Sequence, residues 1–313
     1  MSSSAPAVGG ALRALASPGL SLVYASVFWG ANAVVARAVI HDIDPFSLTF
    51  WRWLLAVIVL LPFVWTYLRK DWPEIVRNAG LITLLGLSSV TAYTITFYVA
   101  SQTTPAINLS LIGSTIPAFS IAAAWIWLGE RVTPTQGAGF AVGFLGVVVV
   151  ICRGDVSVLA EFRIATGDIV LMVGVITWAA YSILLKIRDL KIHRMSLLCG
   201  VFITGFVGTI PFFAWEVAVN DSAVRINLPA LLAIVYGALF MSIGAYFCFM
   251  RGVAALGANK ANAYGYLAPM FAAVFAVGFL GEEFALYHVL SFALIVVGVY
   301  LATATRATPA AIR

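Results

Sequence analysis

The amino-acid sequence predicts an all-α membrane protein of ten transmembrane helices, arranged as two inverted repeats of five helices each. Hydrophobic residues make up 62% of the chain and charged residues 10%, whereas soluble domains carry about 25% charged residues. Apolar windows of about 20 residues, each long enough to cross a bilayer as a helix, recur along the 313 residues. A motif in the first half of the chain also returns in the second half. Together these observations exclude a soluble protein.

Short segments rich in helix-breaking residues, such as Asp44-Pro45, Asp71-Trp72-Pro73 and Thr133-Pro134, separate the apolar windows. We therefore expect residues 1–18 to form an N-terminal cytoplasmic tail, 19–153 the first five-helix repeat, 164–305 the second, and 306–313 a C-terminal tail. The ten windows cover roughly residues 20–40, 46–68, 79–100, 106–128, 134–151, 167–187, 195–216, 228–250, 261–280 and 286–304.

The distribution of lysine and arginine predicts the orientation in the membrane. With the N-terminus in the cytoplasm, 13 of the 18 basic residues lie inside, 4 lie outside, and Arg52 lies within a span. Cytoplasmic loops carry such an excess, so both termini are predicted to be cytoplasmic. Five spans per half reverse the direction of the second half, which makes the repeats inverted. Orientation also explains the net charge of +5, so no nucleic-acid partner is expected.

One motif occurs twice, at an offset of 152 residues. The first copy runs from Pro117 to Gly129-Glu130, and the second runs from Pro269 to Gly281-Glu282. A proline near the middle of a span lacks an N–H group and kinks the helix, so Pro117 and Pro269 are predicted to be hinges for gating. Gly129, Glu130, Gly281 and Glu282 are assigned structural roles at helix ends, where the glutamates bond loop backbone or pair with nearby bases.

Further pairings occur in the same order along the two halves. At an offset of 149, Phe28-Trp29-Gly30-Ala31 faces Thr177-Trp178-Ala179-Ala180, and Arg37 faces Lys186. Each pairing is weak alone, because apolar segments resemble one another by chance. Their collinear order supports a duplicated chain, which is a common construction plan of transporters.

Two halves of five spans, each with Pro-x11-Gly-Glu followed by a short helix, resemble the EamA-type family of the drug/metabolite transporter superfamily. The resemblance covers about residues 20–304, and Arg52, early in the second span, fits that family's pattern. It implies alternating access, a central cavity lined by six spans, and export of small metabolites. Within the family, the chain is most similar to bacterial exporters of aromatic and other amino acids, which implies an inner-membrane location.

The fifth span carries Gly139 and Gly143 as a GxxxG pair, which permits close helix packing within the fold or a dimer face. We therefore expect a monomer or a weak homodimer. The tenth span departs from this pattern, with Ser291, Ile295 and Gly298 at the matching positions. Another helix is therefore expected to pack less closely against the tenth span.

Aromatic and neutral polar residues dominate the centres of the spans. Their hydroxyls and amides could meet ammonium and carboxylate groups, and a substrate ammonium over an aromatic ring gains about 0.5–2 kcal/mol. The alternative is that these rings pack against lipid or one another. The predicted substrate-binding residues are Asn32, Tyr93, Phe97, Asn108, Ser110, Trp178, Tyr181, Tyr246 and Tyr264.

Arg52 is the charged residue that the windows place inside a span. It could attract a substrate carboxylate, extend to the outer surface, or cap a helix end, and the structural interpretations are favoured. No acidic residue occupies the middle of a span, so a directly titrating carboxylate is not expected. Facilitated diffusion is the simpler mechanism.

The predicted function is alternating-access export of amino acids, aromatic and other neutral ones, with a small-molecule substrate and membrane lipid as partners. A multidrug or quaternary-amine exporter of the same fold is the alternative. An intramembrane enzyme would need a nucleophile with a base or metal ligands, and no HExxH or GxSxG motif occurs. A channel would not need mirrored hinges. Cysteines and histidines lie scattered, so we expect no metal and no cofactor.

Overall fold

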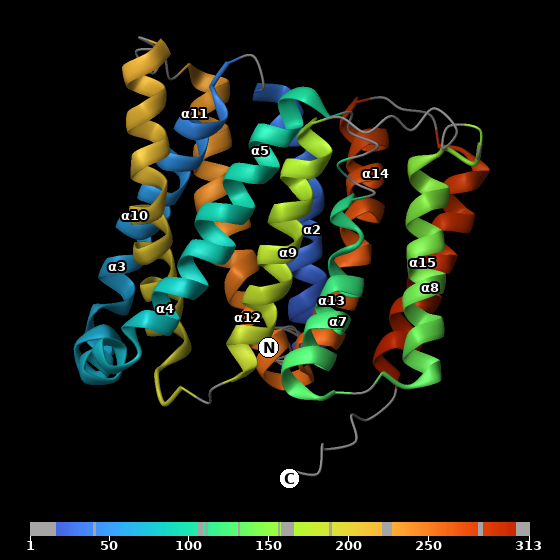
Figure 1. The fold of residues 1–313 in the computed structure, drawn as a ribbon. Coiled ribbons are helices and arrows are strands. Elements are labelled where there is room, and N and C mark those ends of the chain that lie inside the picture. The colour runs from blue at the N-terminus through green and yellow to red at the C-terminus, as the bar shows by residue number, and fades with distance from the viewer. Residues whose placement is uncertain are drawn as a thin grey trace, which may run out of the picture.

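The computed structural model describes residues 17–39, 42–104, 109, 112–130, 132–155, 157, 166–187, 190–220, 227–280 and 284–304, which form a helical bundle without strands in these ranges (Figure 1). In the first half of the chain the helices are Pro18–Val39 (α2), Pro45–Arg77 (α3), Ala79–Gly86 (α4), Leu87–Ala92 (η1), Tyr93–Thr103 (α5), Ile116–Leu128 (α7) and Pro134–Ile151 (α8). In the second half they are Thr166–Ile187 (α9), Arg194–Asn220 (α10), Leu228–Tyr236 (α11), Gly237–Gly244 (η3), Ala245–Leu256 (α12), Ala258–Ala263 (α13), Tyr264–Tyr266 (η4), Leu267–Leu280 (α14) and Leu286–Ala304 (α15).

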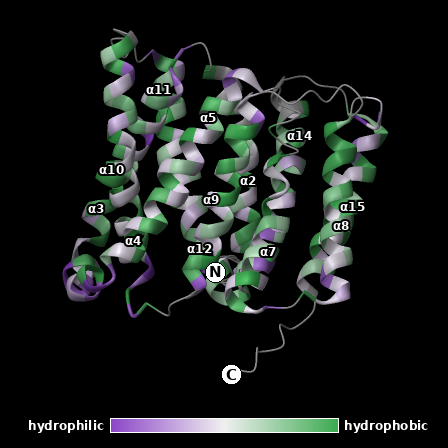
Figure 2. Ribbon diagram, viewed as in Figure 1, coloured by the Kyte–Doolittle hydropathy of each residue, from purple (hydrophilic) through white to green (hydrophobic). Residues whose placement is uncertain are grey.

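Seven of the described helical stretches are long and apolar enough to cross a membrane. Hydrophobic residues cover most of their length, and hydrophilic residues gather toward the ends of the bundle (Figure 2). The protein is therefore a multi-pass membrane protein, while the five-plus-five count stays a prediction. The seven stretches are Pro45–Arg77, Ala79–Thr103, Pro134–Ile151, Thr166–Lys186, Arg194–Val219, Leu228–Leu256 and Leu286–Thr303.

The second span is longer than the sequence indicates. Asp71-Trp72-Pro73 was expected to end it, but α3 continues through Pro73 to Arg77, so that prediction is wrong. A proline removes one hydrogen bond without ending a helix whose flanking turns remain favourable. At 33 residues, α3 is about 50 Å long and exceeds the roughly 30 Å hydrocarbon core. Its last turns therefore extend beyond the bilayer.

Both halves contain a span interrupted by a π-helix. The π-helix η1 lies between α4 and α5, and η3 lies between α11 and α12. Such widened turns leave backbone groups without their usual partners and are frequent at functional sites. Here Thr91 of η1 donates a hydrogen bond from Oγ1 to the Gly205 carbonyl oxygen of α10, at 2.7 Å.

The described chain begins and ends at the same end of the bundle, which we call the terminal face. A Cβ on Gly19, near the start of α2, would lie 2.8 Å from the Tyr264 hydroxyl. The Lys260 ammonium donates to the Thr303 carbonyl oxygen, near the end of α15, at 2.6 Å. Lys260 and Tyr264 belong to the same short stretch of α13 and η4, so both chain ends adjoin it.

Helices α8 and α15 form a close-packed pair at one edge of the bundle (Figure 1). A Cβ on Gly139 would lie 2.3 Å from the Ala302 backbone nitrogen, and one on Gly298 would lie 2.3 Å from the Gly143 nitrogen. The Ser291 hydroxyl donates to the Gly146 carbonyl oxygen at 2.8 Å. The expectation of less close packing at Ser291 and Gly298 is therefore wrong, because a small serine and a glycine suffice for close helix packing.

The packing of α8 on α15 predicts unequal effects for substitutions at two glycines of α8. Gly139→Ala inserts a methyl group against the α15 backbone and should lower the free energy of unfolding by about 1–3 kcal/mol. Gly137→Ala is the matched control, because no described atom lies within 4 Å of its Cβ position, and it should be neutral or slightly stabilising. Thermal unfolding of the purified protein measures both changes. Equal effects would contradict the packing described here.

Candidate functional site

Eight aromatic side chains from six helical elements meet in the middle of the bundle, and we call them the central aromatic cluster. Trp178 of α9 lies at its centre, with its ring 4.8 Å from the Tyr93 ring and 5.3 Å from the Trp29 ring between centroids. The rings of Tyr181, Tyr246 and Phe249 each lie 5.4 Å from Trp178. The members are Trp29, Trp53, Tyr93, Trp178, Tyr181, Phe202, Tyr246 and Phe249.

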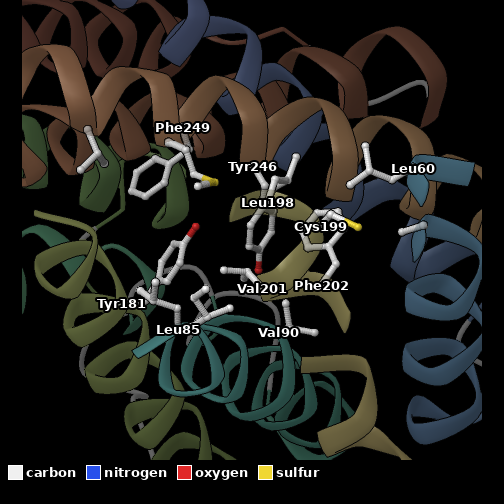
Figure 3. Close-up of a cluster of buried hydrophobic side chains, with 14 of the residues drawn as sticks. Leu60, Leu85, Val90, Tyr181, Leu198, Cys199, Val201, Phe202, Tyr246 and Phe249 are labelled. Carbon is white, nitrogen blue, oxygen red and sulfur yellow. The ribbon is translucent and has the colours of Figure 1, made fainter. Parts of the chain in front are cut away.

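The cluster has a buried floor and an accessible rim. Trp178, Tyr181 and Tyr246 are at most 4% exposed. Figure 3 shows Tyr181 and Tyr246 reaching toward one another from different helices, with Phe249 beside them. Trp29 and Tyr93 keep part of their surface accessible.

Two tyrosine hydroxyls of the floor differ in their hydrogen bonding. Tyr246 Oη donates to the Ser89 carbonyl oxygen, in the π-helix η1, at 2.8 Å. The bond joins α12 of the second half to the interrupted span of the first half. Tyr181 Oη is buried and has no hydrogen-bond partner among the described residues. Such an unpaired hydroxyl costs free energy unless a solute or water supplies a partner.

A buried polar layer connects α7, α9 and α13. Asn262 Nδ2 donates to Ser120 Oγ at 2.9 Å, and Ser182 Oγ donates to Asn262 Oδ1 at 3.4 Å. All three side chains are at most 3% exposed. The layer holds helices of both halves together by bonds that are individually weak, since a neutral hydrogen bond contributes about 0.5–1.5 kcal/mol net.

A charged contact joins the same three helices at the terminal face. Glu130, just after α7, forms an ion pair with Lys186 in the last turn of α9. Asn259 of α13 also donates to Glu130, at 3.5 Å. The Glu130 and Lys186 side chains remain 27% and 37% exposed, so the pair is accessible from outside the bundle. Glu130 thus pairs with a base, one of the two roles expected of it.

Each proline of the repeated motif follows an irregular turn. Pro117 stands in the first turn of α7, after turn residues, and Pro269 lies in the first turn of α14, after the 3-10 segment η4. The expected mid-helix kink at Pro117 is therefore a break followed by a new helix, because proline suits a first helical turn, where its missing N–H is not needed. Pro269 instead lies within a continuous helical stretch from Ala258 to Leu280, just after its 3-10 turn. The hinge role of both prolines stays a prediction.

Gly113 and Gly265 stand four residues before these prolines and also lie 152 residues apart. No described atom lies within 4 Å of either Cβ position. Gly129 ends α7 in a left-handed conformation, with φ of +64°, and its backbone N–H donates to the Trp125 carbonyl oxygen at 3.2 Å. That geometry explains the glycine of the motif.

The structure brings together some of the predicted binding residues. Tyr93, Trp178, Tyr181 and Tyr246 belong to the central aromatic cluster, and the Phe97 ring lies 6.3 Å from Tyr93. Asn32 of α2 is 5% exposed. Tyr264 lies toward the terminal face, away from the cluster centre, where its carbonyl oxygen accepts a bond from Ser26 at 2.8 Å. Asn108, Ser110, Gly281 and Glu282 lie outside the described residues.

Sequence reasoning missed Trp29, Trp53, Phe202 and Phe249 as members of the cluster. A signal existed for Trp29, because it pairs with Trp178 at the offset of 149. Trp53, Phe202 and Phe249 carry no such signal, because many apolar aromatics of this chain face outward. Trp125 and Trp127, for example, are 62% and 60% exposed.

The described helices form a multi-pass membrane bundle around an aromatic centre. The profile of the EamA-like transporter family matches the chain twice, over residues 17–152 and 165–304. The chain therefore belongs to the EamA-like transporter family, within the drug/metabolite transporter superfamily. The family is one of transporters.

Relatives of nearly full length carry transporter names. An uncharacterized transporter of Archaeoglobus fulgidus is 27% identical over 286 residues, covering 91% of this chain and 96% of that protein. The uncharacterized inner membrane transporter YedA of Escherichia coli (strain K12) is 26% identical, covering 88% of this chain and 87% of that protein. A crystal structure with 19% identity superposes with a TM-score of 0.74 over 92% of this chain and 97% of that chain, which shows the fold.

The Tyr246 hydroxyl predicts a measurable stability contribution. Tyr246→Phe leaves the Ser89 carbonyl oxygen without its buried donor and should lower the free energy of unfolding by about 0.5–1.5 kcal/mol. Tyr300→Phe is the control, because Tyr300 is 69% exposed and its change should stay within about 0.5 kcal/mol. Thermal unfolding in detergent measures both. A Tyr246→Phe variant as stable as the wild type would contradict this role.

Proposed function

We propose that the protein exports amino acids, aromatic and other neutral ones, across the bacterial inner membrane by alternating access. The observation that carries the proposal is the central aromatic cluster, which lies between helices of both halves. Its buried rings are neutral, and the Tyr181 hydroxyl among them has no hydrogen-bond partner in the described residues. Aromatic rings can pack on apolar side chains, attract an ammonium group, and offer hydroxyls to polar groups. A small amphipathic solute fits this chemistry.

Alternating access is proposed to rest on two inverted repeats, residues 19–153 and 164–305. Residues that correspond in two repeats related by a twofold axis can touch one another only near that axis. Trp29 and Trp178 correspond at the offset of 149, and their rings meet edge to face at 5.3 Å. The central aromatic cluster would then lie on the axis, where both halves can act on one solute.

The seam of α8 and α15 supports the same symmetry. At the offset of 152, Gly143 corresponds to Ile295 and Gly146 corresponds to Gly298. A twofold axis requires that a contact between Gly143 and Gly298 be accompanied by one between Ile295 and Gly146. Cβ positions built on these glycines show both contacts, at 2.3 Å and 2.8 Å. Contacts of this kind follow from antiparallel packing of α8 and α15, which is the arrangement that inverted repeats require.

The terminal face is proposed to be cytoplasmic, with the N- and C-terminal tails, residues 1–18 and 306–313, on that side. Basic residues gather at this end of the bundle, in the last turns of α3 and α9, in the connection from α9 to α10, in the first turn of α10, and in α13. The described basic residues there are Arg69, Lys70, Arg77, Lys186, Lys191, Arg194 and Lys260. The positive-inside rule then sets the orientation.

Facilitated transport is proposed in place of direct proton coupling. The acidic residues of the described ranges lie in connections or in the end turns of helices, so the centre of the bundle holds no described carboxylate to titrate. An exporter needs to bind only weakly when its substrate accumulates inside the cell. A millimolar dissociation constant, equivalent to about −4 kcal/mol, lies within the reach of ring stacking and a few hydrogen bonds.

Uptake of labelled phenylalanine into proteoliposomes tests this function. We expect saturable flux without an imposed proton gradient, competed by neutral amino acids more strongly than by quaternary amines. Stronger competition by quaternary amines would support a multidrug exporter instead. Flux that requires a proton gradient would overturn the facilitated mechanism.

Trp178→Leu should weaken phenylalanine binding by about 2- to 30-fold, because it removes the central ring while keeping apolar volume. Trp127→Leu is the matched control, since Trp127 is 60% exposed on α7 and lies outside the central aromatic cluster. The concentration dependence of flux measures both variants. Unchanged kinetics in Trp178→Leu would remove this residue from the site.

Opening at the terminal face should require that Glu130 and Lys186 separate. Cysteines introduced by Glu130→Cys and Lys186→Cys, with Cys152, Cys199 and Cys248 replaced, can be joined by a short reducible crosslinker. We expect the crosslink to stop flux and reduction to restore it. The matched control joins Glu74→Cys and Arg77→Cys, an ion-paired couple within the single helix α3, which should leave flux unchanged. Full flux through the crosslinked 130–186 protein would exclude this gate.

A further inference from the structure

Arg52 is an enclosed charge surrounded by neutral groups. Its side chain is 1% exposed. Nη1 donates to Tyr98 Oη at 3.0 Å and to Met241 Sδ at 3.2 Å, and Nη2 donates to Thr94 Oγ1 at 3.3 Å. The guanidinium carbon also lies 4.6 Å from the Trp53 ring centroid. Every one of these partners is uncharged.

The positive charge is therefore only partly compensated. No carboxylate among the described residues forms an ion pair with Arg52, and its Nε–H is buried without a hydrogen-bond partner. Arginine keeps its charge under all ordinary conditions. A charge inside the bilayer is costly, about 2.5–3.5 kcal/mol on insertion scales, and usually marks a functional position. The missing counter-charge points to an anion that binds from outside the chain.

Neighbouring groups define which anion would fit. The planar guanidinium presents parallel N–H groups that match the two oxygens of a carboxylate. Tyr98 and Thr94, from α5, carry hydroxyls that can turn to donate to the same carboxylate. Met241 supplies a thioether, which is a weak acceptor that a carboxylate would readily displace.

The remainder of such a ligand would reach the central aromatic cluster. Trp53, the residue next to Arg52, has its ring 5.4 Å from the Tyr246 ring, and Tyr246 lies 5.4 Å from Trp178. An anionic group at Arg52 and an apolar or ammonium-bearing part at the cluster would thus lie on one continuous path of contacts.

We propose that Arg52 binds the carboxylate of the transported solute, with Tyr98 and Thr94 as further polar contacts. This inference rests on the transport function proposed above. The site opens when α3 and η3 separate, because Gly237 of η3 now lies against the arginine stem, where a Cβ would be 2.5 Å from Arg52 Cδ. Arg52 then selects carboxylate-bearing solutes over amines of the same shape, and it is more than a structural residue.

Three ligands that share a phenyl group and differ in charge test the proposal. They are phenylalanine, phenethylamine, which lacks the carboxylate, and 3-phenylpropionate, which lacks the ammonium. Dissociation constants come from the rise of the unfolding midpoint of purified protein with ligand concentration, so binding is measured without any flux. Arg52→Gln should weaken phenylalanine and 3-phenylpropionate about tenfold or more and change phenethylamine by less than about twofold.

Two further variants keep the result interpretable. Arg52→Lys retains the charge without the bidentate fork, so it should recover part of the carboxylate binding, and it serves if Arg52→Gln does not fold. Arg69→Gln is the matched control, since Arg69 lies on the same helix, also over a tryptophan ring, at 5.9 Å from Trp65, but is exposed. It should change none of the three constants.

Each outcome decides between the two proposals. Equal weakening of all three ligands by Arg52→Gln, or no weakening, overturns the carboxylate site while leaving amino-acid transport in place. Wild-type binding of 3-phenylpropionate without phenylalanine, lost in Arg52→Gln, supports the carboxylate site and overturns the amino-acid assignment. Binding of phenethylamine alone, or of none of the three, overturns both.

Discussion

Every backbone polar group inside a bilayer needs a partner within the protein, and this requirement governs the interior of the molecule. Where the helices depart from regular α geometry, side chains from other elements supply the partners. The carbonyl oxygen of Ser89, in η1, accepts a bond from Tyr246, and that of Tyr264, in η4, accepts one from Ser26. Irregular helix turns are therefore stable only where the bundle surrounds them.

The same requirement explains why the interrupted spans adjoin the proposed site. A break that faced lipid would leave its backbone groups unpaired, whereas a break that faces the centre of the bundle can be paired by hydroxyls. These bonds are neutral and individually weak, so the proposed movement of the halves would exchange them at little cost. Backbone groups of the interrupted spans are thus paired in one conformation, and exchanging their hydrogen-bond partners would cost little free energy.

Some features of the fold could be predicted from the sequence because they depend on local composition. The window at residues 134–151 coincides with α8, since Pro134 starts the helix and apolar residues continue to Ile151. The end of the second span could not be predicted, because Pro73 reads as a breaker although α3 continues to Arg77. Packing of the surrounding turns decides such a case, and packing is not visible in a local window.

Prediction of the site was limited in the same way. Trp178 could be nominated because it lies at the centre of its span, and Trp29 could have been found through the repeat. Phe249 differs from an outward-facing aromatic such as Trp127 only by which side of its helix faces the bundle. A long apolar helix carries almost no polar face to mark that side, so hydropathy alone cannot assign these rings.

In the proposed mechanism, Arg52 connects the charge of the interior to the motion of the two halves. Its hydrogen bonds to Thr94 and Tyr98 hold it to α5 of the first half, while its bond to Met241 reaches η3 of the second half. The thioether is the weakest of the three acceptors, so separation of the halves would break that bond first. The guanidinium would stay with α3 and α5 and turn its free N–H groups to the opened space. In the proposed cycle, a permanent charge held by neutral, exchangeable partners would thus meet an anionic solute in one conformation and be enclosed in another.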